Sequence, residues 1–519
     1  MVTFEWIILL LLGAAALATL AGRVGAPYPT FLALGGVALA FIPASPNWTL
    51  DPRLALALFV APVLLDAAYD TSLRDLRANW RPVTGLVIAA VGTTVLAVGF
   101  VVRWRVPDMP WAVAIALGAI VAPPDAAAAT AVMRQMKLPH KLLKILEGES
   151  LLNDASALLV YRLAILAACS GHLSAATLAP VLLLTIFGSV ATGMACAWVI
   201  GPVTVRLREV PVSLIFQFAT AFGLWIAADA LGLSGILTMV AFAMTLARRG
   251  GVQMPARMRV PIFAVWESAV FVLNAFAFVL IGMQLRPIWQ RLASHGEQGG
   301  ALATAGAVLA ATIAARFAWV LVYTALMRRR LLAQGANPST GKGSGVVLAW
   351  AGMRGIVTLA AAFAIPETLD DGTPFPHRDL ILLCAFAVVL GTLVLQGLTM
   401  APLIRRMELV EDDVVPREIR LGRTQAYRAL LQSIDGDDSV TARLLRKEYD
   451  QIIAANADPG SHEPVDDVPG GALRRRAIAA ARARAFELLR DDVIGDDAYR
   501  VLVQELDWAE LSAGGGRAA

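Results

Sequence analysis

Apolar runs of about 20 residues recur along the first 406 residues, separated by short polar linkers. Each run is long enough to cross a bilayer as a helix, because about 20 helical residues span the hydrocarbon core. The pattern predicts an all-α polytopic membrane protein. We place about 13 spans, at residues 4–22, 29–43, 52–69, 82–104, 110–133, 141–169, 176–205, 211–230, 233–248, 260–284, 299–327, 343–365 and 379–404.

The composition changes after residue 406. The whole chain is 58% hydrophobic and only 16% charged, whereas a soluble protein has about 25% charged residues. Residues 407–519 are instead rich in Arg, Asp and Glu, with helical stretches at 417–433 and 472–489 and a loop at 459–471 between them. We therefore expect two domains, a transmembrane domain at 1–406 and a small cytoplasmic helical domain at 407–519.

The linkers alternate in positive charge. The odd-numbered linkers with their flanking helical turns, together with Arg405 and Arg406 directly after the last span, hold 20 Lys and Arg residues, and the even-numbered linkers with their flanking turns hold six. Because basic linkers stay in the cytoplasm, this alternation predicts an outside N-terminus and a cytoplasmic C-terminus in the cell membrane. It also favours an odd number of spans.

Three acidic residues fall inside apolar sequence between residues 121 and 161. Asp125, Glu149 and Asp154 would each lie at bilayer depth, where a charged side chain is costly and commonly marks an ion or proton pathway. Pro123 and Pro124 precede Asp125 and should interrupt the fifth span, leaving Asp125 to cap the half-helix that begins at 126. Structural pairing with basic residues is the competing interpretation.

The sixth span carries Glu149, Ser150, Asn153 and Asp154 within one broad arc of its helix. Oxygen ligands from Asp154, Asp125 and Ser150, together with backbone carbonyls freed by the prolines, suit a hard cation such as Na⁺. None of these ligands is Cys or His, which argues against a soft transition metal. We expect no resident cofactor.

The twelfth span places Arg354 between Gly352 and Gly355 at membrane depth. An arginine there needs an acidic partner, and we predict Glu149. The glycines should loosen this helix as the prolines loosen the fifth. Since the two spans run in opposite directions, two such interruptions suggest inverted repeats with the transport site between them.

Other polar residues inside the spans are given assisting or structural roles. Asp66 is expected to assist the cation site through water. Structural pairing is the preferred interpretation of Arg162, Asp229, Glu267 and Arg316. Asn274 lies on an apolar run and is interpreted as a hydrogen-bonding residue in helix packing.

Several motifs in these spans resemble those of monovalent cation:proton antiporters of the NhaP and Na⁺/H⁺ exchanger type, and the tail resembles the YjcE-like bacterial branch. The motifs are APPDAAAATAV, GESLLNDASAL, LGLSGILTMVAFAMTLA, FVLNAFAFVLIGMQL, WAGMRGIVTLAAA and LVLQGLTMAPLIRR. The resemblance covers about residues 5–406. It implies a 13-helix fold with inverted repeats, a dimerisation domain, a moving core domain, a homodimer and a role in pH homeostasis.

The resemblance also implies roles for individual residues. Asp154 becomes the cation- and proton-binding carboxylate, with Asp125 and Ser150 as further ligands. Asn153 and the Glu149–Arg354 pair stabilise the site. Asp66 stands where the family often has Glu in the third span.

The sequence departs from the family pattern at two positions. Pro124 replaces a frequent Thr, so only a backbone carbonyl remains there as a ligand. Asp229 replaces a frequent Glu, which leaves its role open. Asparagine at position 153 resembles the electroneutral branch.

The predicted function is antiport of Na⁺, or of Li⁺ or K⁺, against H⁺ by competition at Asp154, with one Na⁺ for one H⁺. Carriers of an organic anion or sugar are an alternative, but residues 121–131 contain no aromatic or basic residue. A channel would show flux without strict proton coupling. An enzyme is not expected, because HExxH and Gly-x-Ser-x-Gly motifs are absent, and no nucleic-acid motif is present.

Overall fold

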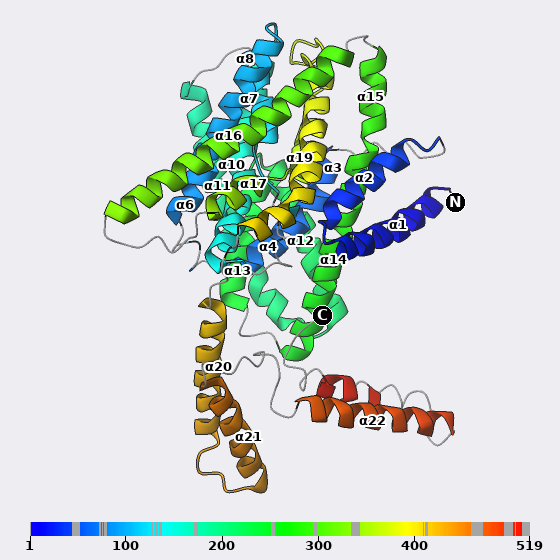
Figure 1. The fold of residues 1–519 in the computed structure, drawn as a ribbon, viewed down its shortest axis with the longest axis vertical. Coiled ribbons are helices and arrows are strands. Elements are labelled where there is room, and N and C mark those ends of the chain that lie inside the picture. The colour runs from blue at the N-terminus through cyan, green and yellow to red at the C-terminus, as the bar shows by residue number, and fades with distance from the viewer. Residues whose placement is uncertain are drawn as a thin grey trace. The chain divides into compact units, whose positions relative to one another are not determined.

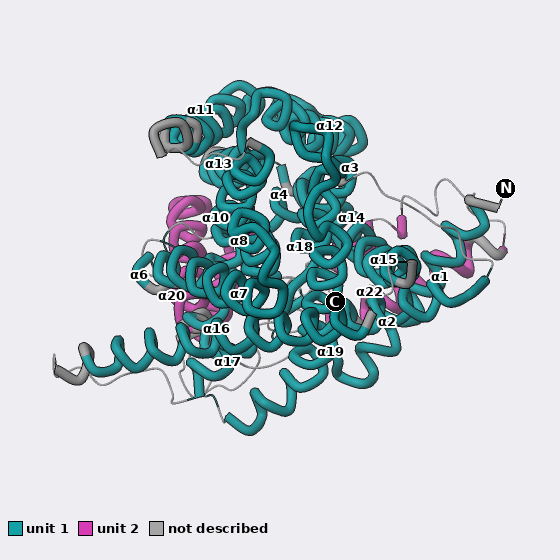
Figure 2. Tube along the Cα trace, turned by 90° about the horizontal axis from the view of Figure 1, so that it is seen from above, with its two compact units in different colours: residues 1–411 teal, residues 412–519 magenta. Residues whose placement is uncertain are grey.

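The computed structural model is built of helices (Figure 1). It describes residues 2–43, 52–71, 74, 76, 80–125, 128–129, 133, 138–170, 175–250, 255–294, 298–333, 343–407, 409, 414–457, 471–491, 502–503 and 505–510. Contacts divide the chain into two units, residues 1–411 and 412–519 (Figure 2), a few residues beyond the boundary expected from composition. The second half of the fifth span, Arg134 and Lys137 lie largely or wholly outside the described residues.

The first unit holds a helical segment in each of the 13 predicted spans. These segments are α1 (Val2–Val24), α2 (Tyr28–Ala40), α3 (Pro52–Ala55), η1 (Leu56–Val60), α4 (Ala61–Asp70), α6 (Trp80–Thr84), η2 (Gly85–Ala90), α7 (Val91–Arg105), α8 (Trp111–Val121), α10 (His140–Ser170), α11 (Ala175–Arg206), α12 (Val210–Ala230), α13 (Gly235–Gly250), α14 (Ala256–Met283), α16 (Gln298–Ala333), α17 (Ser344–Trp350), α18 (Ile356–Phe363) and α19 (Arg378–Arg406). Among the described residues, eight helices are long and apolar enough to cross a membrane, and three shorter helices are also apolar. The number of crossings stays a prediction.

Two features of the third, fourth and tenth segments were not expected. The third and fourth segments each contain a turn of π-helix, η1 and η2. A π-helical turn is a local widening of the helix that is rare overall, but where it occurs it is often close to a functional site. A separate helix, α15 (Leu285–Ser294), follows the tenth segment in a stretch that the sequence analysis left as linker.

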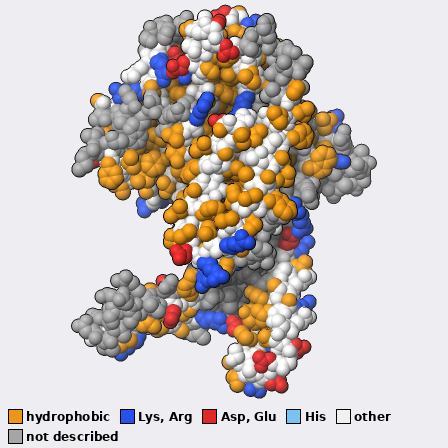
Figure 3. All heavy atoms as spheres, turned by 180° about the vertical axis from the view of Figure 1, so that it is seen from behind, with side chains coloured by type: hydrophobic (Ala, Val, Ile, Leu, Met, Phe, Trp, Pro, Cys, Tyr) orange, Lys and Arg blue, Asp and Glu red, His pale blue; other side chains and the backbone are white. Residues whose placement is uncertain are grey.

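Large apolar side chains remain exposed on the helices of the first unit, as expected of a surface that faces lipid. Leu184, Phe187 and Val199 of α11 and Ile215 of α12 are more than two-thirds exposed. Figure 3 shows hydrophobic side chains over a broad part of one face. A surface of this kind is unsuited to water and is stabilised by a bilayer.

Close helix packing inside the bundle relies on small residues. Gly36 of α2 and Gly282 of α14 face each other, and a Cβ at position 282 would collide with the carbonyl oxygen of Ala33. In membranes such small-residue contacts let two backbones approach closely, which supplies packing that the hydrophobic effect cannot. The α2–α14 contact is therefore specified by glycine.

The second unit is a set of amphipathic helices. Helices α20 (Val414–Ser433) and α21 (Val440–Ala457) pack against each other, with the rings of Tyr427 and Tyr449 5.0 Å apart. Arg446 closes the turn between them by donating to the Ile434 carbonyl at 2.6 Å. Helix α22 (Gly471–Arg490) is tied to the chain after it by Arg482, which pairs with Asp507 and Glu510.

We predict that Gly282→Ala destabilises the protein by forcing α2 and α14 apart. Thermal unfolding in detergent, followed by size-exclusion chromatography, should show a clearly lower Tm. Gly306→Ala in α16 is the matched control, because nothing lies within 4 Å of a Cβ there and alanine favours the helix by about 0.5–1 kcal/mol. Equal Tm values for the two variants would contradict the packing assignment.

Candidate cation site

Two helices are interrupted where the sequence predicts it, and the interruptions meet. Helix α8 ends at Val121, so residues 122–125 are not helical, and residues 351–355 separate α17 from α18. The Asp125 backbone N–H donates to the Met353 carbonyl at 2.6 Å. Because broken backbone at membrane depth needs partners inside the protein, each interruption satisfies part of the other.

Arg354 caps the carbonyl ends of both half-helices. Its fully buried guanidinium donates to the carbonyl oxygens of Val121 at 3.0 Å and Ala122 at 3.4 Å, at the end of α8, and to that of Gly352, just beyond α17. The last carbonyls of a helix have no intrahelical donor and carry partial negative charge, which favours a cation there. Within the described residues Arg354 forms no ion pair, so helix ends take the place of the predicted acidic partner.

Asp125 lies at the opposite kind of helix end. Its carboxylate is so close to Gly355, the N-cap of α18, that a Cβ at position 355 would collide with Asp125 Oδ2. A carboxylate is favoured at a helix N-terminus by the unpaired N–H groups and the helix dipole. Gly355 is thus the residue that lets the Asp125 carboxylate reach α18.

Helix α10 brings the remaining predicted ligands to the same place. Ser150 Oγ donates to the Pro124 carbonyl at 3.3 Å, and the Asp154 side chain, one turn further along, is mostly buried. A cavity of about 580 Å³ is lined by Asp125, Ser150 and Asp154, together with Pro124 and Asp66. Every residue predicted to bind the cation or proton therefore lines one cavity.

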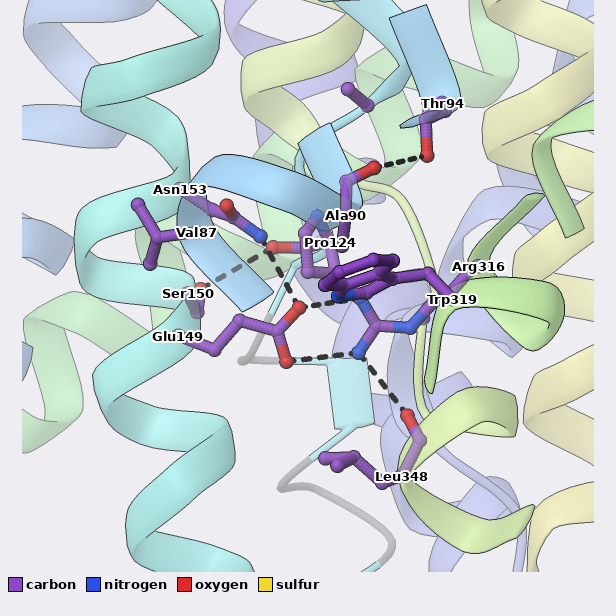
Figure 4. A network of polar contacts seen from close by, with 12 residues as sticks. Val87, Ala90, Thr94, Pro124, Glu149, Ser150, Asn153, Arg316, Trp319 and Leu348 are labelled. Carbon is purple, nitrogen blue, oxygen red and sulfur yellow. Dashed lines mark hydrogen bonds and ion pairs between the residues drawn. The ribbon is translucent and has the colours of Figure 1, made fainter. Parts of the chain in front are cut away.

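Glu149 does not pair with Arg354, which corrects the prediction from sequence. Its two carboxylate oxygens accept from Arg316 of α16, at 2.5 Å from Nη1 and 3.0 Å from Nη2 (Figure 4). Arg316 also donates to the Leu348 carbonyl at 3.1 Å, and Asn153 Nδ2 donates to Glu149 at 3.2 Å. Glu149 and Arg316 are both buried, and neither lines the cavity.

The sequence contains two candidate arginine partners for Glu149, and the prediction from sequence named only Arg354. Two arginines fall at membrane depth in neighbouring spans, and Arg316 was assigned to structural pairing with no named partner. The structure confirms structural pairing for Arg316, and for Arg162 with Asp229 at 3.2 Å. Glu267 differs, because it forms no ion pair among the described residues and instead lines the cavity.

The corrected pairing predicts that Arg316→Ala lowers the yield of folded protein. Removing one partner of a buried ion pair leaves the other charge uncompensated, at a cost of about 3–5 kcal/mol. Glu149→Gln combined with Arg316→Met should recover much of the loss, since both charges are then absent. Fluorescence-detected chromatography of membrane extracts measures the yield. A normal yield from Arg316→Ala alone would contradict the pairing.

Comparisons with known proteins agree with this fold. The family model for the sodium/hydrogen exchanger, transmembrane, matches residues 7–406. An uncharacterised Na⁺/H⁺ exchanger of Mycobacterium tuberculosis is 31% identical over 97% of this chain and 95% of its own length. The uncharacterised exchanger YjcE of Escherichia coli is 28% identical over 93% of this chain and 94% of its own.

One further relative and one solved structure extend the comparison. A sodium, potassium, lithium and rubidium/H⁺ antiporter of Bacillus subtilis is 32% identical over 71% of this chain and 56% of its own length. The sodium proton antiporter MjNhaP1 of Methanocaldococcus jannaschii shares the fold, with a TM-score of 0.60 at 17% identity over 78% of this chain and 98% of its own. From these matches together, the chain is a multi-pass membrane protein that belongs to the sodium/hydrogen exchanger family.

Proposed function

We propose that this protein exchanges Na⁺, or another alkali cation, for H⁺ across the cell membrane by alternating access. Asp154 is the carboxylate at which cation and proton compete, and Asp125, Ser150 and the Pro124 carbonyl assist in binding the cation. The observation that carries the proposal is the cavity that Asp154 and Asp125 line beside two interrupted helices. Interrupted helices of this kind offer carriers both free carbonyls and helix N-termini.

The arrangement of charge supports exchange rather than simple cation binding. Arg316 neutralises Glu149 away from the cavity, so Glu149 does not take part in the exchange. The Asp154 side chain is 8% exposed on the wall of the cavity, where a bound cation or a proton can compensate its charge. Because a charged, empty carboxylate is costly at membrane depth, the carrier crosses only with Asp154 occupied.

We infer from two cavities the side of the membrane from which the cation site is reached in this structure. The larger cavity is also lined by Asp70 and Thr71, in a linker predicted to be cytoplasmic, and by Lys144 and Glu147, in the first two turns of the sixth span, which follows another such linker. A second cavity of about 220 Å³ is lined by Arg291, Glu367 and Arg378, which belong to linkers predicted to be outside. Phe59 and Ile356 line both cavities and separate them. On this interpretation the structure is open to the cytoplasm, and the outside pathway closes at these two residues.

The Bacillus subtilis relative is named as an antiporter of sodium, potassium, lithium and rubidium, which favours a broad set of alkali cations. Selectivity among Na⁺, Li⁺ and K⁺, a homodimeric assembly and a role in pH homeostasis are extensions of the proposal. The outside N-terminus and cytoplasmic C-terminus rest on the distribution of Lys and Arg among the linkers.

Asp154→Asn should abolish Na⁺ uptake driven by a pH gradient in liposomes, because the amide cannot exchange a proton for a cation. The measurement is the initial rate of radiolabelled Na⁺ uptake by purified protein. Asp371→Asn, at an exposed loop residue whose carboxylate bonds Thr373, is the matched control and should retain the rate. Retained exchange in Asp154→Asn would refute the site.

One exchangeable charge at Asp154 predicts an electroneutral exchange of one Na⁺ for one H⁺. Setting the liposome voltage with K⁺ and valinomycin should then leave the initial rate of Na⁺ uptake unchanged at a fixed pH gradient. The Na⁺ rate is the only readout, because K⁺ is itself a candidate substrate. A control series in which choline replaces K⁺ measures how far K⁺ competes with Na⁺ for transport. A rate that follows the imposed voltage would mean that more than one proton moves per Na⁺.

A further inference from the structure

Two neutral oxygens on the wall of the cavity have no hydrogen-bond partner among the described residues. They are the Thr358 hydroxyl oxygen, on α18, and the Asn274 side-chain carbonyl oxygen, on α14. Thr358 is 1% exposed and Asn274 is 4% exposed, so bulk solvent does not reach them freely. Both residues line the cavity that contains Asp125 and Asp154. Asn274 was interpreted as a packing residue, but its side-chain carbonyl accepts no hydrogen bond from the part of the chain that the structure describes.

The position of Thr358 connects it to the proposed ligands. It is the third residue of α18, one turn beyond Gly355, against which the Asp125 carboxylate lies. Residues three apart on a helix share a face, so Thr358 and the Asp125 contact are on the same side of α18. The hydroxyl oxygen of Thr358 therefore lies on the same side of α18 as the Asp125 carboxylate, one helical turn further along.

Asn274 supplies an oxygen from α14, a helix that packs against α18. Helix α14 contacts α18, and it turns one face towards the cavity through Glu267, Val270, Phe271 and Asn274. Their spacing of three and four residues is that of a single helix face. Glu267 and Asn274 are thus two oxygen-bearing residues, two turns apart, on the same wall.

A buried oxygen without a partner destabilises a protein unless something in the cavity satisfies it. Hard cations in proteins take about six oxygen ligands, whereas only two of the carboxylates that line the cavity, Asp125 and Asp154, are proposed to bind the cation directly. Among the described residues, no group of three His, Cys, Asp or Glu side chains is placed to hold a metal ion. Neutral oxygens are consequently needed to complete the coordination.

We propose that Thr358 Oγ1 and Asn274 Oδ1 are further ligands of the transported cation. The assignment rests on the proposed function. Because both groups are neutral, they replace water around the cation without changing the charge that Asp154 exchanges. They set the affinity for the cation and the preference among alkali cations, while the ratio of cation to proton stays the same.

The test compares Thr358→Val, Thr358→Ser and Asn274→Ala with the unaltered protein in liposomes. Thr358→Val removes the hydroxyl at constant shape, and Thr358→Ser keeps it. We expect the apparent KM for Na⁺ to rise about fivefold or more in Thr358→Val and Asn274→Ala, with kcat within about twofold and with Thr358→Ser close to the unaltered protein. Ser268→Ala, on the exposed face of α14, is the control and should change neither constant.

Thermal unfolding separates a ligand from a structural residue. In choline buffer Thr358→Val should be at least as stable as the unaltered protein, because an unsatisfied hydroxyl has been removed. Added Na⁺ should raise its Tm less than that of the unaltered protein. A lower Tm in choline with an unchanged Na⁺ shift would assign Thr358 to structure and overturn the proposal.

The outcomes also distinguish this inference from the proposed function. Exchange by the unaltered protein, loss in Asp154→Asn and unchanged KM values in Thr358→Val and Asn274→Ala would overturn the additional ligands alone. Absence of exchange by the unaltered protein would refute the proposed function. In that case the difference in Na⁺-dependent Tm still decides whether these oxygens bind the cation.

Discussion

The guanidinium of Arg354 joins the carbonyl ends of two interrupted helices, and the arrangement of the site depends on that junction. A helix that stops inside a membrane leaves carbonyls without donors, in surroundings where water cannot replace them. Arg354 donates to carbonyls at the end of α8 and next to α17. Its own backbone N–H donates to Thr392 of α19 at 3.0 Å, which fixes the junction to a long helix. The interruptions can therefore persist without solvent.

The same junction places positive helix ends where the acidic residues are. Once α17 and α18 are separated, the N-terminus of α18 is free to receive the Asp125 carboxylate. Gly352 and Gly355 make this possible from two sides, because a Cβ at either position would collide with Arg316 or with Asp125. Small residues in this segment thus serve close approach of charged groups rather than flexibility alone.

Two arginines at similar depth have different tasks. Arg354 satisfies backbone carbonyls, whereas Arg316 compensates the charge of Glu149 through a bidentate pair. Such a pair has fixed geometry and links α10 to α16, although its net contribution to stability is modest once desolvation is included. As a result, the Glu149 carboxylate does not line the cavity, whereas the Asp125 and Asp154 carboxylates do.

The sequence by itself determined the helical segments, both interruptions and the five predicted binding residues that share the cavity. Apolar runs of membrane length, Pro123 and Pro124, and Gly352 and Gly355 act locally, so their effect is legible without a fold. The tertiary structure alone decided that Arg316 rather than Arg354 binds Glu149, that α15 forms, and that Glu267, Asn274 and Thr358 line the cavity. Partner choice among buried charges, and which polar side chain points into a cavity, depend on distances between helices far apart in the chain, and hydrophobic periodicity carries no information on those distances.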